Sequence, residues 1–390
     1  MLLSFSSRHS KTASLVVQGL ACLCLTSFSF YGQTPAPPPV PRIDSIVSKE
    51  TVNQNPLIYG RDGTFSAKIG GRAYWTFNDT AMRAYNIDGH NFISNTLSWT
   101  DSLNASNGIY LNHDHLDRTG VPIEYMPFTA AEKQFNDIHD PHHCTAIPAT
   151  TCGEDYAIWP GPLVPIPGTT MAYQFYGKVF RGGDVQGFEP LGAGVALEAG
   201  GKFIRPVEAP GTPDPTLMWQ GEEVTYAGGA LVEDGLLYAI GCKVGFLVEN
   251  CRIARVPILE VIHKPSWRYY SGSGTWSSDP NAAVTIFQGG AAGNSIFYDK
   301  ALHEYIAIYS GIFSNNVYYR AANHPWGPWS PESLLFVGQQ GESGTVNYAA
   351  LAHPEFEEDE GLTEYVTYVQ NTGFLQQALQ LVKVTFVRSQ

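Results

Sequence analysis

The sequence predicts an all-β fold, and three observations carry that prediction. A short tyrosine-containing strand phrase recurs five times. Its tyrosines are 99, 65, 67 and 60 residues apart, and the first gap approaches the others once a polar segment near residues 80–145 is set aside. Convincing amphipathic helices are few, and residues 129–135 are the best short candidate. This period fits one blade of a β-propeller, so we predict five blades. The phrases span residues 73–77, 172–176, 237–241, 304–309 and 364–368.

The N-terminal region has the pattern of a secretory signal peptide over residues 1–33. It begins with basic residues, continues through an apolar stretch at 13–30 and ends in small or polar residues. The residues before Cys22 make a poor lipoprotein cleavage box, which favours a released protein over a lipid-anchored one. We therefore expect a secreted protein, extracellular or periplasmic.

The rest of the chain is expected to form one large domain. Residues 34–54 are a Pro-rich linker and N-terminal extension, and residues 55–390 form a single propeller domain with an insertion at about 80–145. No later apolar run is long enough to span a membrane. Removing residues 1–33 deletes two basic and no acidic side chains, which takes the formal charge from −13 to −15 and argues against nucleic acid as a partner. The sequence is silent on oligomeric state.

The first hairpin of this domain carries an acidic residue at each open end. Its Gly70-Gly71 pair suits a two-residue turn, because both central positions take positive φ. Counting outward, paired residue numbers sum to 141, which places Asp62 opposite Asp79. Directly opposed side chains lie about 5 Å apart at Cβ, and like charges that close raise one pKa. This arrangement is typical of a proton-sharing catalytic pair. The alternative is one N-terminal cap and one solvated loop acid, and a bulge or a splayed strand end would separate the two groups.

The first strands of the five blades bring distant residues together, because a propeller gathers these strand ends around one central depression. Acids precede the first three strands and amides precede the last two. The residues at these starts are Asp62, then Glu154 and Asp155, then Glu222 and Glu223, then Asn294, then Asn347. This uneven distribution favours a catalytic cleft at one side of the ring.

Four cysteines remain after residue 33, in two local pairs. An oxidising compartment favours the disulfides Cys144–Cys152 and Cys242–Cys251. Neither pair has the short spacing of a zinc knuckle, so a metal site is the weaker alternative for these cysteines.

Several motifs resemble a bacterial and fungal propeller family long described only as a domain of unknown function, some members of which are endo-D-arabinanases. The motifs are Gly60-Arg61-Asp62-Gly63, Phe77-Asn78-Asp79-Thr80, residues 94–99, Trp159-Pro160-Gly161, and the stretches 231–257, 320–330 and 348–354. Their order is the signal, and the resemblance covers most of residues 55–388.

The resemblance implies a glycoside hydrolase that cleaves furanoside linkages, possessing a catalytic pair at Asp62 and Asp79. The chain departs from the family pattern at Asn78, where glycine is more common, and in the long insertion after Thr80. Other five-bladed glycosidases place a base, a helper acid and a proton donor on successive blades, which would select Asp62, Asp155 and Glu223 instead.

The two schemes predict different stereochemistry. Carboxyl groups about 5 Å apart give retention, as expected for Asp62 with Asp79, whereas about 6.5–9.5 Å gives inversion, as expected for Asp62 with Glu223. The function predicted is thus a secreted hydrolase of a furanoside-containing polysaccharide, such as an endo-D-arabinanase. The alternatives are a non-catalytic carbohydrate-binding propeller and a secreted interaction scaffold.

Further side chains near the strand starts are candidates for substrate binding. Aromatic rings stack on sugar faces, and polar side chains bind hydroxyl groups. The aromatic candidates are Trp159, Tyr226 and Tyr348, and the polar candidates are Arg61, Asn78, Asn294 and His353.

Two histidine-rich segments lie in the insertion, at residues 113–117 and 139–143. On a strand, His113, His115 and Asp117 would share a face, which permits a zinc or calcium ion. Solvated loop histidines are the commoner outcome, so we expect no required cofactor and keep a bound metal ion in the insertion as the alternative.

Overall fold

The computed structural model describes residues 36–182, 187–206, 210–244 and 249–388 of the chain. The signal peptide expected at residues 1–33 lies outside these ranges. Strands dominate the described residues, and α1 (Ala130–His139) is their one α-helix. The all-β prediction is confirmed, and the short helix expected at 129–135 forms close to its predicted place.

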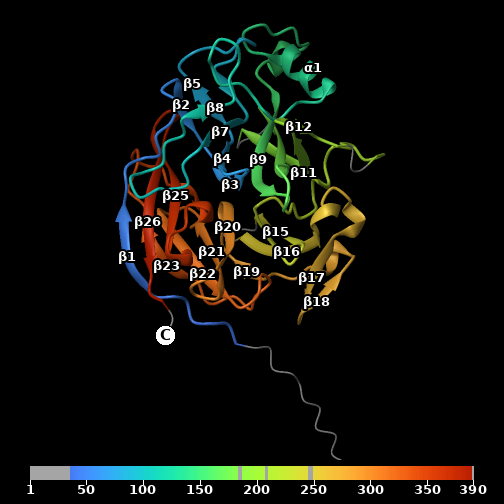
Figure 1. Ribbon diagram of the computed structural model, residues 1–390. Coiled ribbons are helices and arrows are strands. Elements are labelled where there is room, and N and C mark those ends of the chain that lie inside the picture. Colours follow the sequence, from blue (N-terminus) through green and yellow to red (C-terminus); the bar gives the residue numbers. More distant parts are fainter. Residues whose placement is uncertain (1–35, 183–186, 207–209, 245–248, 389–390) are drawn as a thin grey trace, which may run out of the picture. The chain divides into compact units, whose positions relative to one another are not determined.

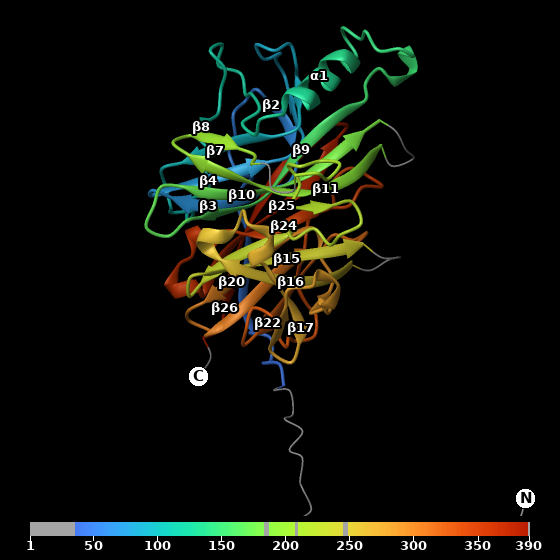
Figure 2. The same ribbon diagram turned by 90° about the vertical axis from the view of Figure 1, so that its right-hand side faces the viewer.

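Five of the six sheets in the described chain are antiparallel meanders of neighbouring strands (Figure 1, Figure 2). The first consists of β3 (Phe65–Ile69), β4 (Arg72–Phe77), β7 (Thr96–Thr100) and β8 (His113–Asp114). The second consists of β9 (Asp155–Pro165), β10 (Ala172–Arg181), β11 (Phe188–Ala199) and β12 (Lys202–Ile204), with β13 (Trp219–Gln220) on β11. The third consists of β14 (Gly229–Glu233), β15 (Leu236–Val244), β16 (Glu249–Pro257), β17 (Arg268–Gly272) and β18 (Thr275–Ser277), with β19 (Phe287–Gln288) on β16.

The remaining meanders and a small extra sheet complete the described strands. The fourth sheet consists of β20 (Ala291–Asp299), β21 (Glu304–Ser310), β22 (Asn316–Ala322) and β23 (Ser333–Val337). The fifth consists of β24 (Tyr348–Ala352), β25 (Thr363–Gly373), β26 (Gln376–Phe386) and β1 (Ile43–Ser48). The extra sheet consists of β2 (Ile58–Arg61), β5 (Thr80–Met82) and β6 (Phe92–Ile93). Short 3-10 helices lie at Ala149–Thr151, Ile258–Glu260, Lys264–Ser266, Pro280–Ala282, Pro354–Phe356 and Asp359–Gly361.

The five tyrosine phrases occupy the same place in the five meanders. Each falls on the second strand, which is β4, β10, β15, β21 or β25. The second strand has a hydrogen-bonded neighbour on each edge, and its residues are largely buried on both faces. Its sequence is therefore rich in aromatic and other apolar residues. The sequence repeat therefore reports a repeated position in the sheets.

Successive sheets pack on one another through buried apolar clusters. Each cluster draws its members from two successive sheets, and the fifth sheet packs on the first through Val369 and Trp75. The first strands border a shared cavity of about 280 Å³, which is lined by one or more residues from each of β3, β9, β14, β20 and β24. Ser66 Oγ on β3 also bonds His353 Nδ1, just after β24. The first and last sheets are thus joined at this centre.

Two segments that the sequence predicted to lie outside the blades contribute strands to the meanders. The N-terminal extension supplies β1, which pairs with β26 in the last sheet, and Figure 1 shows this blue strand beside the red one. The 80–145 segment supplies β7 and β8 to the first sheet. The parts of that segment that stand outside the meanders are the loops around β6 and the region of α1.

Candidate active site

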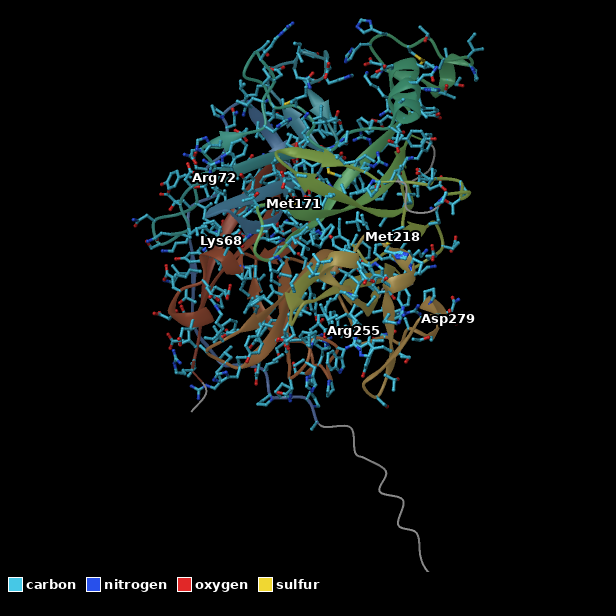
Figure 3. All side chains as sticks on the ribbon, turned by 45° about the vertical axis from the view of Figure 1, so that its right-hand side comes forward. Lys68, Arg72, Met171, Met218, Arg255 and Asp279 are labelled. Atoms are coloured by element: carbon cyan, nitrogen blue, oxygen red, sulfur yellow. A yellow bond between two sulfur atoms is a disulfide. The ribbon has the colours of Figure 1, made fainter. Side chains whose placement is uncertain are left out.

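The register predicted for the first hairpin is confirmed. Ser66 pairs with Trp75 and Ile69 pairs with Arg72, so the paired numbers sum to 141. Lys68 and Arg72, labelled in Figure 3, stand on the two strands beside the Gly70-Gly71 turn, whose glycines both have positive φ. The turn chemistry therefore fixes the alignment of every residue beyond it.

The acidic pair lies where this ladder is interrupted. The pairing of β3 with β4 stops short of the pair and resumes beyond it as β2 with β5, where Arg61 again faces Thr80. In the gap, Asp62 N donates to Asp79 O at 3.2 Å and Asn78 N donates to Asp62 O at 2.7 Å. Asp62 and Asp79 are therefore opposed across the hairpin, as the count from the turn predicts.

A glycine makes this gap compact. Gly63 has a φ of +60°, and a Cβ placed on it would collide with the Asn78 side chain. The close approach holds the two segments of the hairpin together where the regular β-ladder pairing is interrupted. Only glycine meets both conditions without strain.

Asp79 is held by two donors from the second sheet. Arg181 Nη1 donates to Asp79 Oδ1 at 2.8 Å, and Trp159 Nε1 donates to the same oxygen at 2.9 Å. Arg181 faces Asp155 across β10 and β9 and bonds its carboxylate through Nε at 2.7 Å and through Nη2. Arg181 therefore bridges Asp79 and Asp155. With Trp159, this brings three of the predicted residues together.

Asp62 has fewer donors and keeps a proton more readily. Tyr348 OH lies 3.4 Å from Asp62 Oδ2, and the other oxygen, Oδ1, is buried with no partner. Burial and the charge of Asp79 raise the pKa of Asp62 to about 8. Burial also raises the pKa of Asp79, but there Arg181 and Trp159 favour the charged form. Asp62 is thus the member of the pair that holds a proton more readily, and Asp79 is the member whose charged form has the donors.

A cavity of about 700 Å³ opens beside Arg181, the residue that bonds Asp79, although neither Asp62 nor Asp79 lines it. Asp155 and Arg181 line it from the second sheet, and the 80–145 segment supplies most of the rest of its wall, including Phe92 and residues 136–142. The Arg181 guanidinium lies 5.2 Å from the centre of the Phe92 ring. The space next to Arg181 and Asp155 is therefore within the range of about 300–1,000 Å³ that is typical of ligand sites.

Glu223 is not joined to this group. Its carboxylate accepts from Lys264 Nζ at 2.8 and 2.9 Å and from the backbone N of Gln220 at 2.8 Å. The strand expected to start there, β14, begins only at Gly229. Among the described residues, no bond links Glu223 to Asp62 or Asp79. Of the acids in the scheme of three successive blades, the structure brings Asp155 to the pair and leaves Glu223 apart from it.

Two polar candidates are instead buried in the framework. Arg61 is 3% exposed, lies 3.4 Å over the Phe77 ring and donates to Ser98 Oγ at 2.8 Å, and burial lowers its pKa to about 9. His353 is fully buried, with its ring stacked on Trp75. Burial lowers the pKa of His353 to about 3, so the ring is neutral. Neither side chain is open to a sugar.

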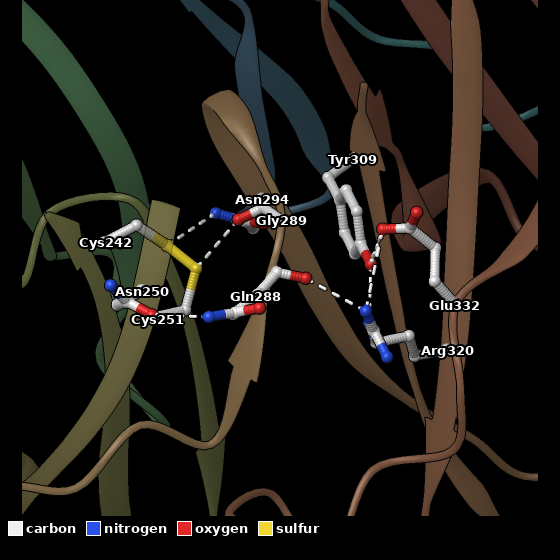
Figure 4. Close-up of a disulfide and its surroundings, with 9 residues drawn as sticks. All are labelled: Cys242, Asn250, Cys251, Gln288, Gly289, Asn294, Tyr309, Arg320 and Glu332. Carbon is white, nitrogen blue, oxygen red and sulfur yellow. Dashed lines mark hydrogen bonds and ion pairs between the residues drawn. A yellow bond between two sulfur atoms is a disulfide. The ribbon is translucent and has the colours of Figure 1, made fainter. Parts of the chain in front are cut away.

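Tyr226 and Asn294 are also buried. Tyr226 packs against Trp219 in the core between the second and third sheets. Asn294 lies at a bulge in β20 and points its Nδ2 at the sulfur of Cys242 at 3.4 Å, as Figure 4 shows. Trp159, Tyr348 and Asn78 are the substrate-binding candidates that the structure places at the acidic pair.

Both disulfides form as paired from the sequence. Cys144–Cys152 closes the loop that follows α1, and Cys242–Cys251 joins β15 to β16. The alternative of a metal site in the 80–145 segment gains no support: the described residues contain no group of three or more His, Cys, Asp or Glu side chains placed to hold a metal ion. Asp117 instead accepts backbone bonds from Ile87, Thr119 and Val121. No helix in the described ranges has the length and apolarity needed to cross a membrane.

Sequence reasoning missed Arg181 and Glu124. Arg181 ends β10 and reaches the pair only because β9 and β10 bring it opposite Asp155, through a register that contains a bulge. Glu124 lines the cavity and accepts from Ser94 N and Oγ at 3.1 and 3.0 Å, and burial raises its pKa. A cation at a strand end facing a predicted catalytic acid is the one signal that would have selected Arg181.

Comparison with known proteins supports this fold. Residues 205–372 match the family described as a domain of unknown function, DUF4185. None of the curated proteins matches the chain. A Bacteroides ovatus protein, described provisionally as a hydrolase, is 15% identical with a TM-score of 0.54, over 85% of this chain and 87% of its own. A GH43_1 enzyme from Xanthomonas citri is 12% identical with a TM-score of 0.47, over 86% and 89%. Zg3597, a family 117 glycoside hydrolase from Zobellia galactanivorans, is 9% identical with a TM-score of 0.48, over 87% and 90%. The chain shares its overall fold with the first of these.

Proposed function

We propose that this protein is a glycoside hydrolase that cleaves furanoside linkages in a polysaccharide, with endo-D-arabinanase action as the specific form. The observation that carries the proposal is the opposed pair Asp62 and Asp79, in which one carboxyl group has two donors and the other has a buried oxygen without a partner. Two carboxyl groups in unlike environments are what glycoside hydrolysis requires.

In the proposed reaction, Asp79 is the nucleophile and Asp62 the acid and base. Asp79 attacks the anomeric carbon while the glycosidic C–O bond breaks and Asp62 gives its proton to the leaving oxygen. A water molecule then attacks the glycosyl–enzyme ester, Asp62 takes the proton of that water, and Asp79 leaves as a carboxylate. The sugar is released with its original anomeric configuration.

The neighbouring residues support these roles. Arg181 and Trp159 both donate to Oδ1 of Asp79, which favours the carboxylate over the acid before attack. Asp155 neutralises Arg181 and sets its position, so it acts as a positioning residue. Tyr348 holds Asp62 from the fifth sheet, and half-buried Trp159 offers part of its ring to a sugar.

We also infer that the five meanders are the blades of a five-bladed propeller. Their order of packing, the contact of the fifth sheet with the first, and the central cavity lined by all five first strands support this arrangement. The two disulfides fit an oxidising compartment, so we further propose that the protein is secreted to the extracellular or periplasmic space, where its partner is a polysaccharide.

The test is reducing-sugar release from arabinan, arabinogalactan and other furanoside polymers by the wild type and by Asp62→Asn and Asp79→Asn. We expect both variants to lose activity by about 10³-fold or more, because each removes one of two essential carboxyl groups. Asp101→Asn, at an exposed ion pair with Arg72, is the control and retains activity. Proton NMR of the first product identifies the anomer, and an inverted anomer contradicts the hairpin pair. A folded wild type inactive on every polymer favours the carbohydrate-binding alternative.

A further inference from the structure

The cavity beside the acidic pair is built mostly by the 80–145 segment. Its wall comes from residues 88–93, 123–128 and 133–142, and the second sheet closes it with Glu154, Asp155 and Arg181. Neither Asp62 nor Asp79 lines the cavity, but Arg181 does, and it bonds both Asp79 and the lining residue Asp155. A chain bound in the cavity therefore reaches Arg181, one hydrogen bond away from Asp79.

The wall is rigid where it meets the second sheet. Thr129 and Glu132 form a capping box at the start of α1, and the Glu132 carboxylate is bound by Lys178 at 2.7 Å and by Arg205 at 2.6 and 3.0 Å. Asn136 makes two bonds to the backbone of Tyr156, at 2.8 and 2.9 Å. These bonds, with the disulfide after the helix, preform the cavity, so binding there costs little ordering of the protein.

The lining has one exposed aromatic platform. Phe92 is 38% exposed although it is a large apolar side chain, and its neighbour Ile93 on β6 is 2% exposed. Burying the Phe92 ring under a sugar would recover the free energy lost by its exposure. The Arg181 guanidinium lies over the same ring, 5.2 Å from its centre, so a sugar stacked on the free face of Phe92 lies one ring away from the residue that bonds Asp79.

The charge of the lining discriminates among glycans. Six carboxylic acids line the cavity, against two lysine or arginine cations, which are Lys133 and Arg181. Lys133 is paired with Asp137 at 2.8 Å, and Arg181 is paired with Asp79 and Asp155. The described lining thus offers a uronate or sulfate group no unpaired lysine or arginine, and its excess of acids repels such groups. The hydroxyl groups of a sugar, in contrast, can donate to the carboxylate oxygens of this lining.

We propose that the 80–145 segment forms a binding subsite for an uncharged glycan segment next to the cleaved bond, with Phe92 as its stacking platform and its acidic lining as a filter against acidic glycans. This inference rests on the proposed function, because it takes Asp79 as the point of cleavage.

Binding to the full chain carrying Asp79→Asn, measured by calorimetry, tests the inference separately from hydrolysis. The probes are neutral pentasaccharides of arabinose, xylose and galactose, and pentagalacturonate as the acidic probe. We expect at least one neutral probe to bind at least ten-fold more tightly than pentagalacturonate. Adding Phe92→Ala weakens that binding at least ten-fold. Phe313→Ala is the matched control, because Phe313 is 77% exposed and lies between β21 and β22.

A second variant tests the charge filter. Asp88→Lys, at an exposed lining position, should raise the affinity for pentagalacturonate at least three-fold. Binding of the acidic probe as tight as that of the neutral probes, an unchanged affinity in Phe92→Ala, or no binding of any neutral probe overturns the inference. If a neutral probe binds with Phe92 dependence but the wild type hydrolyses no polymer, the proposed function fails and the subsite stands.

Discussion

Arg181 is the residue on which the candidate site depends most. Its guanidinium bonds Asp79 and Asp155 and lies against the ring of Phe92. Arg181 therefore forms an ion pair with Asp79 and also lines the cavity. Together with Trp159, this side chain from β10 gives Asp79 donors that Asp62 lacks.

Replacing this cation should move the pH dependence of activity. In Arg181→Gln, Asp79 loses the donor and charge that favour its ionised form, so its pKa rises and the acid limb of the kcat/KM profile moves to higher pH. We expect the maximal rate to fall by about 10²-fold. Arg72→Gln, which removes an exposed cation paired with Asp101, should leave the profile unchanged. An unshifted acid limb in Arg181→Gln would show that Asp79 does not titrate in catalysis.

We expect the alkaline limb of the kcat/KM profile to report the titration of Asp62. If Asp62 supplies the proton, activity falls as the pH rises through its pKa of about 8, because the acid form is then lost. Substrates with leaving groups that need no protonation, such as nitrophenyl furanosides, should keep their first-step rate above pH 8. A parallel loss for both kinds of substrate would contradict this role.

A buried acid far from the site should control stability. Glu364 on β25 is fully buried, and neither carboxylate oxygen has a partner. Burial, with the charges of nearby acids, raises its pKa well above the ordinary value. The neutral form is therefore favoured on folding, so its contribution is present below about pH 4.3, the unfolded pKa, and is lost as the pH rises toward the folded pKa.

Glutamine stays neutral at both pH values, so Glu364→Gln should raise the free energy of unfolding relative to the wild type by more at pH 8 than at pH 5. The difference is about 1.4 kcal/mol for each pH unit over which the wild-type carboxyl stays protonated in the folded state and ionises in the unfolded state. Urea unfolding at the two pH values measures it. Glu358→Gln is the comparison, because Lys383 lowers the pKa of Glu358 and its removal should destabilise the protein at pH 8. A stability gain that is equal at both pH values would point to packing and not to titration.

At the scale of elements, the first hairpin sets the geometry of the acidic pair. Its sequence contains enough information to locate that pair, because the Gly70-Gly71 turn and the strict two-residue alternation determine the register. The interruption of the ladder between β3 and β2 was not predictable by counting, since it depends on Gly63 packing against Asn78. The paired residue numbers still sum to 141 beyond the gap, because each side of the hairpin contributes the same number of residues to it.

Two glycine variants separate the gap from the turn. Gly63→Ala and Gly71→Ala both place an alanine at positive φ, but only the first meets a neighbour, the Asn78 side chain. We expect Gly63→Ala to lower kcat by about 10-fold or more through displacement of Asp62, whereas Gly71→Ala loses some stability and keeps kcat. Steady-state kinetics with circular dichroism as a folding check decides this. Equal kcat in the two variants would mean that the gap does not position the pair.

The acids of the other sheets illustrate where sequence reasoning ends. Asp155 starts β9 as expected and reaches the pair through Arg181. Glu223 lies in the turn after β13, where its carboxylate accepts from the backbone N of Gln220 and binds Lys264. The two positions look alike in sequence. They differ in long-range pairing, which the local pattern does not encode.

On the scale of the described molecule, the order of the five sheets was predictable because each repeats one aromatic second strand. The role of residues 43–48 was not, since β1 shows weak strand alternation and most of its side chains are exposed. Its partner is β26, and Val40 and Ile43 pack against the core of the fourth and fifth sheets. The extension is therefore part of the last sheet.

Removing that strand should loosen the fold. A chain truncated to begin at residue 49 should lose at least ~2 kcal/mol in the free energy of unfolding, through lost ladder bonds and the exposure of the apolar surface under β1. A chain truncated to begin at residue 36 is the control. Urea unfolding midpoints measure the difference, and equal midpoints would mean that β1 is a passive addition.

The pairing of β1 with β26 has a consequence for how the protein is made. More than 300 residues of chain separate the two strands, so the sheet that holds the start of the fold waits for a strand near residue 380 to leave the ribosome. Until then the edge of β1 has no partner and the fifth sheet is incomplete. Synthesis and folding are thus ordered in time: the chain can fold its early sheets as it emerges, yet the acidic pair, whose Asp62 contacts Tyr348 of that last sheet, is completed only after nearly every residue has been added.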